Sequence, residues 1–303
     1  MLTPRMAELL ARIQRADRPA FHSLSPQQAR IAYRMGAEIL DLPRAPLARV
    51  ESVSLANRPA RLYAPSFERL PALLYLHGGG FTIGGLDTHD SLCRQLSLRA
   101  GCAVISLDYR LAPEHRFPAA VDDCTAALRE LSKCGGAWGL DADRLAVGGD
   151  SAGGTLAAVC ALQARDESLS LRLQLLITPG TSARADTESH ARFAKGYLLD
   201  ADAIAWFFSQ YIAEAEREDW RFAPLNASDH EGLAPACVVL AEADPLVDEG
   251  LAYADRLRAS GVPVELELVR GVTHDFIKMG RMLPEAAKAQ QAAADALKRA
   301  FST

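Results

Sequence analysis

The feature that most constrains the fold is a series of six short apolar runs that alternate with helix-forming segments. Several of these runs are almost continuously apolar, which is typical of strands buried on both faces of a sheet. The runs lie at residues 72–76, 102–107, 144–148, 173–177, 236–240 and 264–269. Helices are predicted at about 118–133, 152–165, 248–260 and 284–301. This alternation predicts an α/β fold with a mostly parallel sheet between helices.

The N-terminal part of the chain has a different pattern. Residues 1–45 show helical periodicity, and Ser25 and Gln28 have the spacing of a capping box at the start of a second helix. Alternating apolar and polar residues then predict two more strands, at 46–55 and 60–64. The N-terminal helices therefore precede the sheet and lie outside its repeating pattern.

One interval is too long for a simple crossover between strands. Over fifty residues separate the run ending near Thr178 from the run starting near Ala236, and this interval contains a strongly aromatic helix-forming segment. We interpret the interval as an insertion that covers the sheet. The predicted organisation is N-terminal helices of a cap at 1–45, a cap insertion at 181–233, and a catalytic domain at 46–180 and 234–303.

Composition excludes several classes of partner. The net charge is -5 and both signs are interspersed, so no basic face for nucleic acid or an anionic membrane is expected. No stretch approaches the ~20 apolar residues of a membrane span, and Arg5, Glu8 and Arg12 interrupt the first apolar residues. We therefore expect a cytoplasmic protein. The six cysteines have no metal-site spacing, and we expect them to be reduced and buried.

The strongest local motif is Gly149-Asp150-Ser151-Ala152-Gly153, between a predicted strand and a predicted helix. A nucleophilic serine on a sharp strand-to-helix turn needs this context, because side chains at the flanking glycines would collide across the turn. The helix N-terminus also favours developing negative charge at the serine oxygen. We predict Ser151 as a nucleophile.

A second motif, His77 followed by three glycines and Phe81, comes directly after a buried strand. Consecutive glycines allow backbone N–H groups to approach a ligand, as stabilisation of an oxyanion requires. We predict an oxyanion hole formed by the N–H groups of Gly78, Gly79 and Ala152. A phosphate cradle is the rival interpretation, but the lysine-serine pair of a P-loop is missing. His77 precedes the serine and is expected to shape the glycine loop.

The serine needs a base and an orienting carboxylate, in the chain order serine, acid, histidine. His190, His230 and His274 follow the serine, and His274 comes just after the last strand, where its loop reaches the carboxyl edge of the sheet. Asp244 ends a core strand in the same way, whereas Asp248 reads better as a helix-start residue. We predict Asp244 and His274 as the partners of the serine.

Together these motifs resemble the hormone-sensitive-lipase-like carboxylesterases, also called bacterial lipolytic family IV, of the α/β-hydrolase superfamily. The resemblance rests on the segments 77–81, 108–114, 117–123, 149–154 and 244–248 and on the region of His274. It implies an α/β-hydrolase fold with eight strands, one of them antiparallel, and a helical cap. It also implies esters of short to medium acyl chains as substrates, no cofactor and no metal. Segment 108–114 would tie down the oxyanion loop.

The resemblance has one departure beside the predicted base. The family usually has glycine after the catalytic histidine, and here the residue is Asp275, which we expect to raise the histidine pKa or to narrow the pocket. The predicted substrate pocket is formed by Phe81, Asp150, Tyr197, Trp206 and Phe207.

The expected reaction is ester hydrolysis through an acyl-enzyme on Ser151, with activity rising with pH near the unperturbed histidine pKa of about 6.5. Two alternatives remain at this point. One is an amidase or peptidase on the same fold, and the other is a non-catalytic ligand-binding homologue. The edge strand at 264–269 is a candidate surface for a homodimer.

Overall fold

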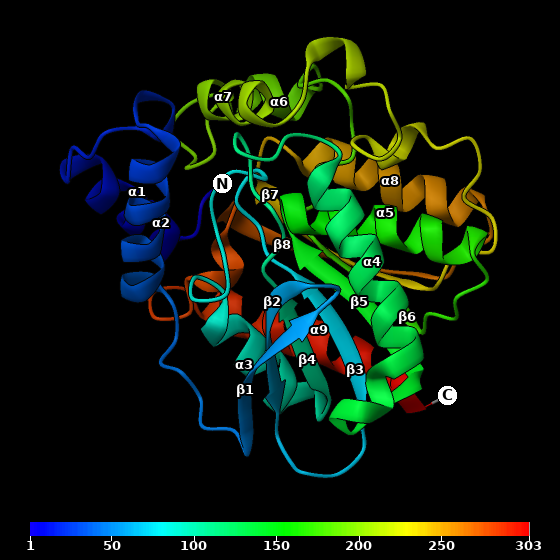
Figure 1. Cartoon of the computed structure of the whole chain (residues 1–303). Helices are drawn as coiled ribbons and strands as arrows, with labels where there is room; N and C mark the ends of the chain where they lie inside the picture. Colours follow the sequence, from blue (N-terminus) through cyan, green and yellow to red (C-terminus); the bar gives the residue numbers. More distant parts are fainter. Residues whose placement is uncertain (303) are drawn as a thin grey trace.

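The computed structural model describes residues 1–302, and these residues form one sheet of eight strands (Figure 1). The strand order across the sheet is β1-β2-β4-β3-β5-β6-β7-β8. The strands are β1 (Arg49–Leu55), β2 (Arg58–Ala64), β3 (Leu70–Leu76), β4 (Ala103–Leu107), β5 (Leu140–Asp150), β6 (Leu173–Ile177), β7 (Ala236–Ala243) and β8 (Val264–Thr273). Strand β2 pairs antiparallel with both of its neighbours, and all other pairs are parallel. The predicted α/β-hydrolase fold is confirmed.

Helices cover both faces of the sheet and divide the core into two parts. One part packs against α4 (Ala119–Cys134), α5 (Ala152–Asp166) and α8 (Val247–Ala259). The other packs against α3 (Asp90–Ala100) and α9 (Pro284–Ser302). Successive side chains of a strand point to opposite faces, so Leu74 and Leu76 of β3 join the first part, whereas Leu73 and Tyr75 join the second.

Helix α3 is a sheet-flanking helix that the sequence analysis missed. It buries Leu92, Cys93 and Leu96 against the sheet, and Gly101 ends it in the left-handed conformation with φ of 66°. Its polar residues, such as Asp90 and Ser97, are buried as well, which hides the amphipathic pattern that a periodicity search uses.

Four helices lie outside the two layers, next to the carboxyl ends of the parallel strands (Figure 1). They are α1 (Pro4–Arg15), α2 (Pro26–Leu40), α6 (Glu188–Arg192) and α7 (Ala201–Tyr211), with the short turns η1 (Phe21–Ser23), η3 (Glu214–Glu216) and η4 (Pro224–Asn226). The predicted capping box of α2 is present, because Ser25 Oγ accepts from Gln28 N and Gln28 Oε1 accepts from Ser25 N.

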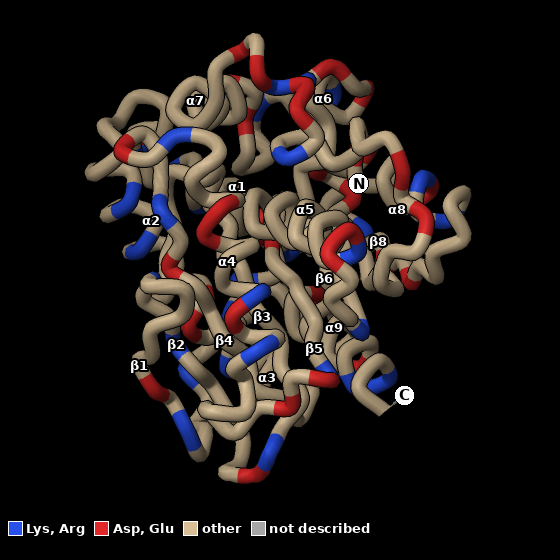
Figure 2. The backbone as a smooth tube through the Cα atoms, turned by 45° about the vertical axis from the view of Figure 1, so that its right-hand side comes forward, with Lys and Arg blue, Asp and Glu red and all other residues tan. Residues whose placement is uncertain are grey.

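The charged residues follow no single-sign pattern. Figure 2 shows acidic and basic positions interspersed over the helices outside the two layers and over the sheet-flanking helices. In the part of the chain that the structure describes, no helix is both long and apolar enough to cross a membrane. Cys134 is exposed, and the other five cysteines within residues 1–302 are free and buried, so the expectation of burial is wrong for this one position.

Candidate active site

Ser151 lies on a sharp bend between β5 and α5. Its backbone is at φ of 53° and ψ of -124°, a strained conformation for a residue with a side chain. A Cβ atom on Gly149 would lie 2.3 Å from the Leu76 carbonyl oxygen, and one on Gly153 would lie 1.9 Å from the same atom. The bend therefore requires both glycines, and it presents the serine side chain at the edge of the sheet.

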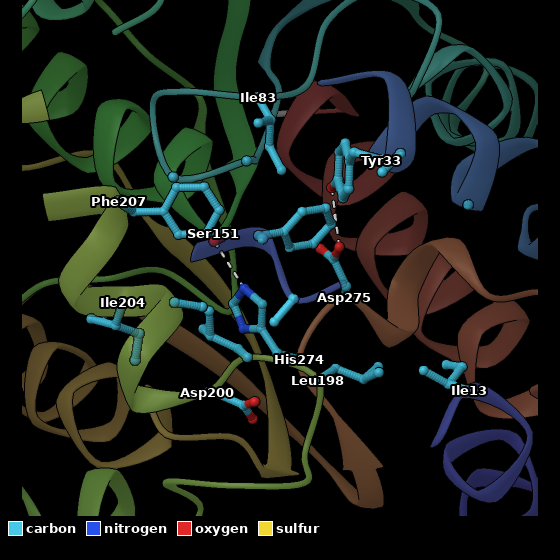
Figure 3. A pocket seen from close by; sticks show the side chains of 18 of the residues that line it. Ile13, Tyr33, Ile83, Ser151, Leu198, Asp200, Ile204, Phe207, His274 and Asp275 are labelled. Carbon is cyan, nitrogen blue, oxygen red and sulfur yellow. Dashed lines mark hydrogen bonds between the residues drawn. The ribbon is translucent and has the colours of Figure 1, made fainter. Parts of the chain in front are cut away.

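The three predicted triad residues come together at this edge, and Figure 3 shows two of them, Ser151 and His274. The Nε2 atom of His274 is 2.9 Å from Ser151 Oγ, and its Nδ1 atom is 2.7 Å from Asp244 Oδ2. Because a carboxylate only accepts hydrogen bonds, Nδ1 carries the proton and Nε2 is free to accept from the serine hydroxyl. Asp244 also accepts from Leu246 N at 2.9 Å, which fixes the carboxylate at the end of β7.

The surroundings of His274 set its protonation. Burial disfavours the charged imidazolium, but the carboxylates of Asp244, Asp275 and Asp150 outweigh it and raise the pKa of His274 to about 9. The expected rise of activity near pH 6.5 is therefore moved upward, because a base must be neutral to accept a proton.

The other two histidines after the serine lie elsewhere. His190 faces Glu249, with 3.6 Å between Nε2 and Oε2, and burial lowers the pKa of this histidine. The Nε2 atom of His230 lies 3.0 Å from the Pro224 carbonyl oxygen. Asp248 accepts from Ser189 N at 2.7 Å and so connects α8 to α6 of the insertion rather than to a histidine.

The glycine loop after β3 departs from the prediction at one position. The Gly78 N–H donates to Asp150 Oδ1 at 3.2 Å, so this amide is used inside the protein. By contrast, the N–H groups of Gly79 and Gly80 have no acceptor within residues 1–302, and both glycines line the pocket. Ala152 begins α5, where a backbone N–H has no partner in the helix. The amide of Gly78 is thus replaced by that of Gly80 in the candidate oxyanion hole.

Asp150 is not a pocket residue, which corrects the prediction made from its place beside the serine. It is 1% exposed and anchors the glycine loop. It accepts from Tyr75 Oη at 2.6 Å and, besides Gly78, from His89 Nε2 at 3.2 Å. Burial alone would raise the pKa of this carboxyl, but His89 and Tyr75 hold it well below its usual range.

His77 shapes the same loop, as its place before the glycines predicts. Its Nδ1 atom lies 2.9 Å from the Gly78 carbonyl oxygen, and its ring stacks on Tyr109 with 4.2 Å between centroids. The Tyr109 hydroxyl donates to the His77 carbonyl at 2.6 Å, and the neighbouring Arg110 forms a two-pronged ion pair with Asp123. Segment 108–114 therefore packs against the glycine loop and stabilises it.

A cavity of about 760 Å³ opens above Ser151. Phe81 and Phe207 line it, whereas Tyr197 and Trp206 do not, which corrects the prediction for these two. Tyr197 packs edge-on against Phe193, with 4.9 Å between centroids. Trp206 packs edge-on against its neighbour Phe207 on α7, with 5.0 Å between ring centroids. Figure 3 shows Phe207 and Ser151 among the side chains that line this cavity.

Several polar residues that the sequence analysis missed also line the cavity, among them Tyr33, Glu249 and Lys278. Glu249 is buried and accepts from Thr181 N at 2.6 Å, and burial raises the pKa of this carboxyl to about 8. The sequence analysis assigned the neighbouring Asp248 to the start of a helix. It had no reason to single out Glu249, because no local sequence pattern distinguishes a buried glutamate from an exposed one. Within residues 1–302 no group of three or more His, Cys, Asp or Glu side chains is arranged to hold a metal ion.

Comparison with known proteins identifies the family. Residues 73–278 match the family described as the alpha/beta hydrolase fold, and the chain belongs to this family. It is 43% identical over 277 residues to an ethyl acetate hydrolase of Pseudomonas putida, covering 88% of this chain and 87% of the relative. It is 42% identical over 254 residues to carboxylesterase NlhH of Mycobacterium tuberculosis, covering 82% of this chain and 80% of the relative.

A solved structure gives the same result. The ester-hydrolase EH1AB1 from the metagenome of Lake Arreo, complexed with a derivative of bipyridine phosphonate, has a TM-score of 0.96. It is 40% identical in sequence, and the match covers 100% of both chains. The resemblance to esterases that the motifs predict is confirmed by these relatives.

Proposed function

We propose that this protein is a carboxylic-ester hydrolase that works through an acyl-enzyme on Ser151. The observation that carries the proposal is the unbroken relay from Ser151 Oγ to His274 Nε2, at 2.9 Å, and from His274 Nδ1 to Asp244 Oδ2, at 2.7 Å. Relatives named as esterases support the same reaction.

In the first half of the proposed reaction, His274 takes the proton of Ser151 as the serine oxygen attacks the ester carbonyl. Asp244 stabilises the resulting imidazolium. The N–H groups of Gly79, Gly80 and Ala152 are the proposed donors to the oxyanion. Losing one such donor typically costs about 2.7–4 kcal/mol of barrier.

In the second half, His274 returns its proton to the alcohol, which leaves. A water molecule, deprotonated by the same imidazole, then attacks the acyl-enzyme and releases the acid. Every proton transfer in this cycle involves Nε2 of His274, so the position of the imidazole ring affects the rates of both acylation and deacylation.

The cavity supports a substrate of short to medium acyl chain. A volume of about 760 Å³ is within the usual range for sites of small organic ligands. Phe81, Ile204 and Phe207 supply apolar walls. In this proposal the helices of residues 1–45 and of the insertion 181–233 form the cap, and the rest of the chain forms the catalytic domain.

An active-site probe tests the proposal. The protein is treated with a fluorophosphonate and the labelled peptide is identified by mass spectrometry. We expect the label on Ser151 and its loss in Ser151→Ala. Ser182→Ala is the matched control, because Ser182 lines the same cavity without a histidine partner. Labelling that persists in Ser151→Ala would overturn the assignment.

The same purified protein also distinguishes ester hydrolysis from the two alternative functions. An amidase or peptidase would cleave an anilide as well as the matched nitrophenyl ester, whereas an esterase would cleave the ester and leave the anilide intact. A ligand-binding homologue would take no label. The contact between all three triad side chains favours catalysis over binding alone. A homodimer through β8, the last strand of the sheet, and a cytoplasmic location stay predictions.

A further inference from the structure

Helix α2 is attached to the main domain mostly by polar side chains. Along this helix, all of which the structure describes, Ala29 alone is buried. Apolar burial therefore contributes little to its position. Arg30 and Tyr33, which are three residues apart and so lie on one face of the helix, reach two different loops of the main domain.

Arg30 holds the turn that contains the candidate oxyanion donors. Its Nε atom donates to the Thr82 carbonyl at 2.9 Å, and its Nη2 atom donates to the Ala112 carbonyl at 2.9 Å. The guanidinium is fixed in turn by Glu114, with 2.6 Å between Nη2 and Oε2. Because Thr82 N donates to the Gly79 carbonyl at 3.0 Å, a shift of Thr82 moves the glycine loop.

Tyr33 holds the loop of the proposed base. Its hydroxyl donates to Asp275 Oδ2 at 3.0 Å (Figure 3). It also accepts a hydrogen bond from Lys278 Nζ. Lys278 is buried, lies 4.2 Å from the centre of the Tyr33 ring and forms an ion pair with Asp275 at 3.5 Å. The three side chains satisfy one another in a closed polar cluster inside the pocket wall.

Asp275 transmits this contact to the histidine. It directly follows His274, and its φ of 64° lies in the left-handed region, which costs a residue with a side chain about 1–2 kcal/mol. Aspartate and asparagine tolerate this conformation better than other such residues. The bonds to Tyr33 and Lys278 favour the strained backbone, and the strained backbone aims the His274 ring.

From these contacts we propose that α2 is a positioning clamp. Arg30 sets the oxyanion loop, and Tyr33, through Asp275, sets the general base, so one turn of a cap helix holds both against the same substrate. Ala32, Gly36 and Ala37 of α2 line the cavity, so a bound ester contacts the clamp itself. This inference rests on the proposed ester hydrolysis, and Arg30, Tyr33 and Asp275 act as positioning residues.

The test measures kcat and KM on a nitrophenyl ester, each per site titrated with the fluorophosphonate and at the pH of maximal activity of each variant. Tyr33→Phe removes the hydroxyl and keeps the ring. We expect kcat to fall roughly tenfold with KM changed by less than about twofold, because a displaced base weakens the transition state more than substrate binding. Tyr197→Phe is the matched control, since this tyrosine lies outside the cavity.

Substitutions of Asp275 separate positioning from stability. Asp275→Ala removes the acceptor of the Tyr33 hydroxyl and also the ion pair with Lys278, so we expect a loss of kcat at least as large as in Tyr33→Phe. Adding Tyr33→Phe to it should cause little further loss, because the hydrogen bond between the two residues is already gone. Asp275→Asn keeps an acceptor and tolerates the left-handed backbone, so we expect kcat within about twofold of the parent. If Asp275→Ala does not fold, Tyr33→Phe and Asp275→Asn still decide the question.

Arg30→Lys tests the other arm of the clamp. Lysine lacks the forked guanidinium, so we expect a further loss of kcat that adds to that of Tyr33→Phe, because the two arms hold different loops. Arg34→Gln, on the exposed face of α2, is the control. A kcat in Tyr33→Phe within about twofold of the parent, or an equal loss in Tyr197→Phe, would overturn the clamp. Either result leaves the Ser151 labelling, and with it the proposed function, unaffected.

Discussion

Replacing Asp150 by asparagine tests whether a buried charge next to the nucleophile holds the oxyanion loop. The carboxylate accepts from Tyr75, Gly78 and His89 at 2.6, 3.2 and 3.2 Å. Asparagine has the same shape and keeps an acceptor for Tyr75 and Gly78, but its amide nitrogen faces the Nε2–H of His89. The substitution therefore removes the negative charge and replaces the hydrogen bond from His89 by a repulsive contact between two N–H donors.

The structure sets the expected magnitude. Hydrogen bonds to a charged group contribute about 1.5–3 kcal/mol and neutral ones about 0.5–1.5 kcal/mol, so three weakened bonds amount to roughly 3 kcal/mol. The relieved burial of a charge offsets part of this loss, and we expect a net destabilisation of about 2 kcal/mol. For a chain of 303 residues this is a fall in Tm of roughly 3 °C. Displacement of the Gly79 and Gly80 amides should also lower kcat by about tenfold.

The assay combines thermal unfolding at pH 7 with kcat per titrated site. The control is Asp143→Asn, because Asp143 is an exposed aspartate on the same strand, β5. Because the pKa of Asp150 is depressed by folding, its charge stabilises the protein above the unfolded pKa of about 3.9, and this contribution is lost as the pH falls below that value. The stability gap between variant and parent should therefore narrow in acid. An Asp150→Asn protein that melts within about 1 °C of the parent and keeps its kcat would refute the anchoring role.

Three further predictions concern the titrating groups of the site. Asp244→Asn should lower kcat by about 10⁴-fold with little change in KM, because the amide favours the wrong tautomer of His274, and a loss below about tenfold would contradict the relay. Since Asp244 and Asp275 raise the pKa of His274 to about 9 against burial, kcat/KM should keep rising up to about pH 9, and a plateau from pH 7 onward would contradict this environment. Burial raises the pKa of Glu249 to about 8, so this group costs no stability below its unfolded pKa of about 4.3 and destabilises the fold as the pH rises toward 8. Denaturant unfolding should accordingly show Glu249→Gln gaining on the parent between pH 5 and pH 8.5.

Local sequence was sufficient for the parts of the site that depend on neighbouring residues. The bend at Ser151 needs glycine on both sides, because a Cβ on either would strike the Leu76 carbonyl, and the motif states this requirement directly. Likewise, Asp244 and His274 follow core strands, and in a parallel sheet the carboxyl ends of strands meet at one edge. Chain order and strand position thus identified three residues that lie together.

Local sequence was not sufficient where adjacent residues of similar type have different structural roles. Gly78, Gly79 and Gly80 look equivalent, but the first gives its N–H to Asp150, 72 residues away. Trp206 and Phe207 are equally aromatic, and only the rotation of α7 decides which one faces the cavity. Asp150 appeared to belong to the pocket because it precedes Ser151, yet the alternation of a strand turns it inward.

The sequence by itself determined the fold class, the sharp turn of the nucleophile and the order of the triad, because periodicity, turn chemistry and strand ends are properties of short segments. Tertiary structure alone decided that Tyr33 meets Asp275, 242 residues along the chain, and that the buried Lys278 contacts both of them. The physical reason is that a hydrogen bond between distant residues depends on how helices and loops pack to within about 3 Å, and no local pattern encodes that distance.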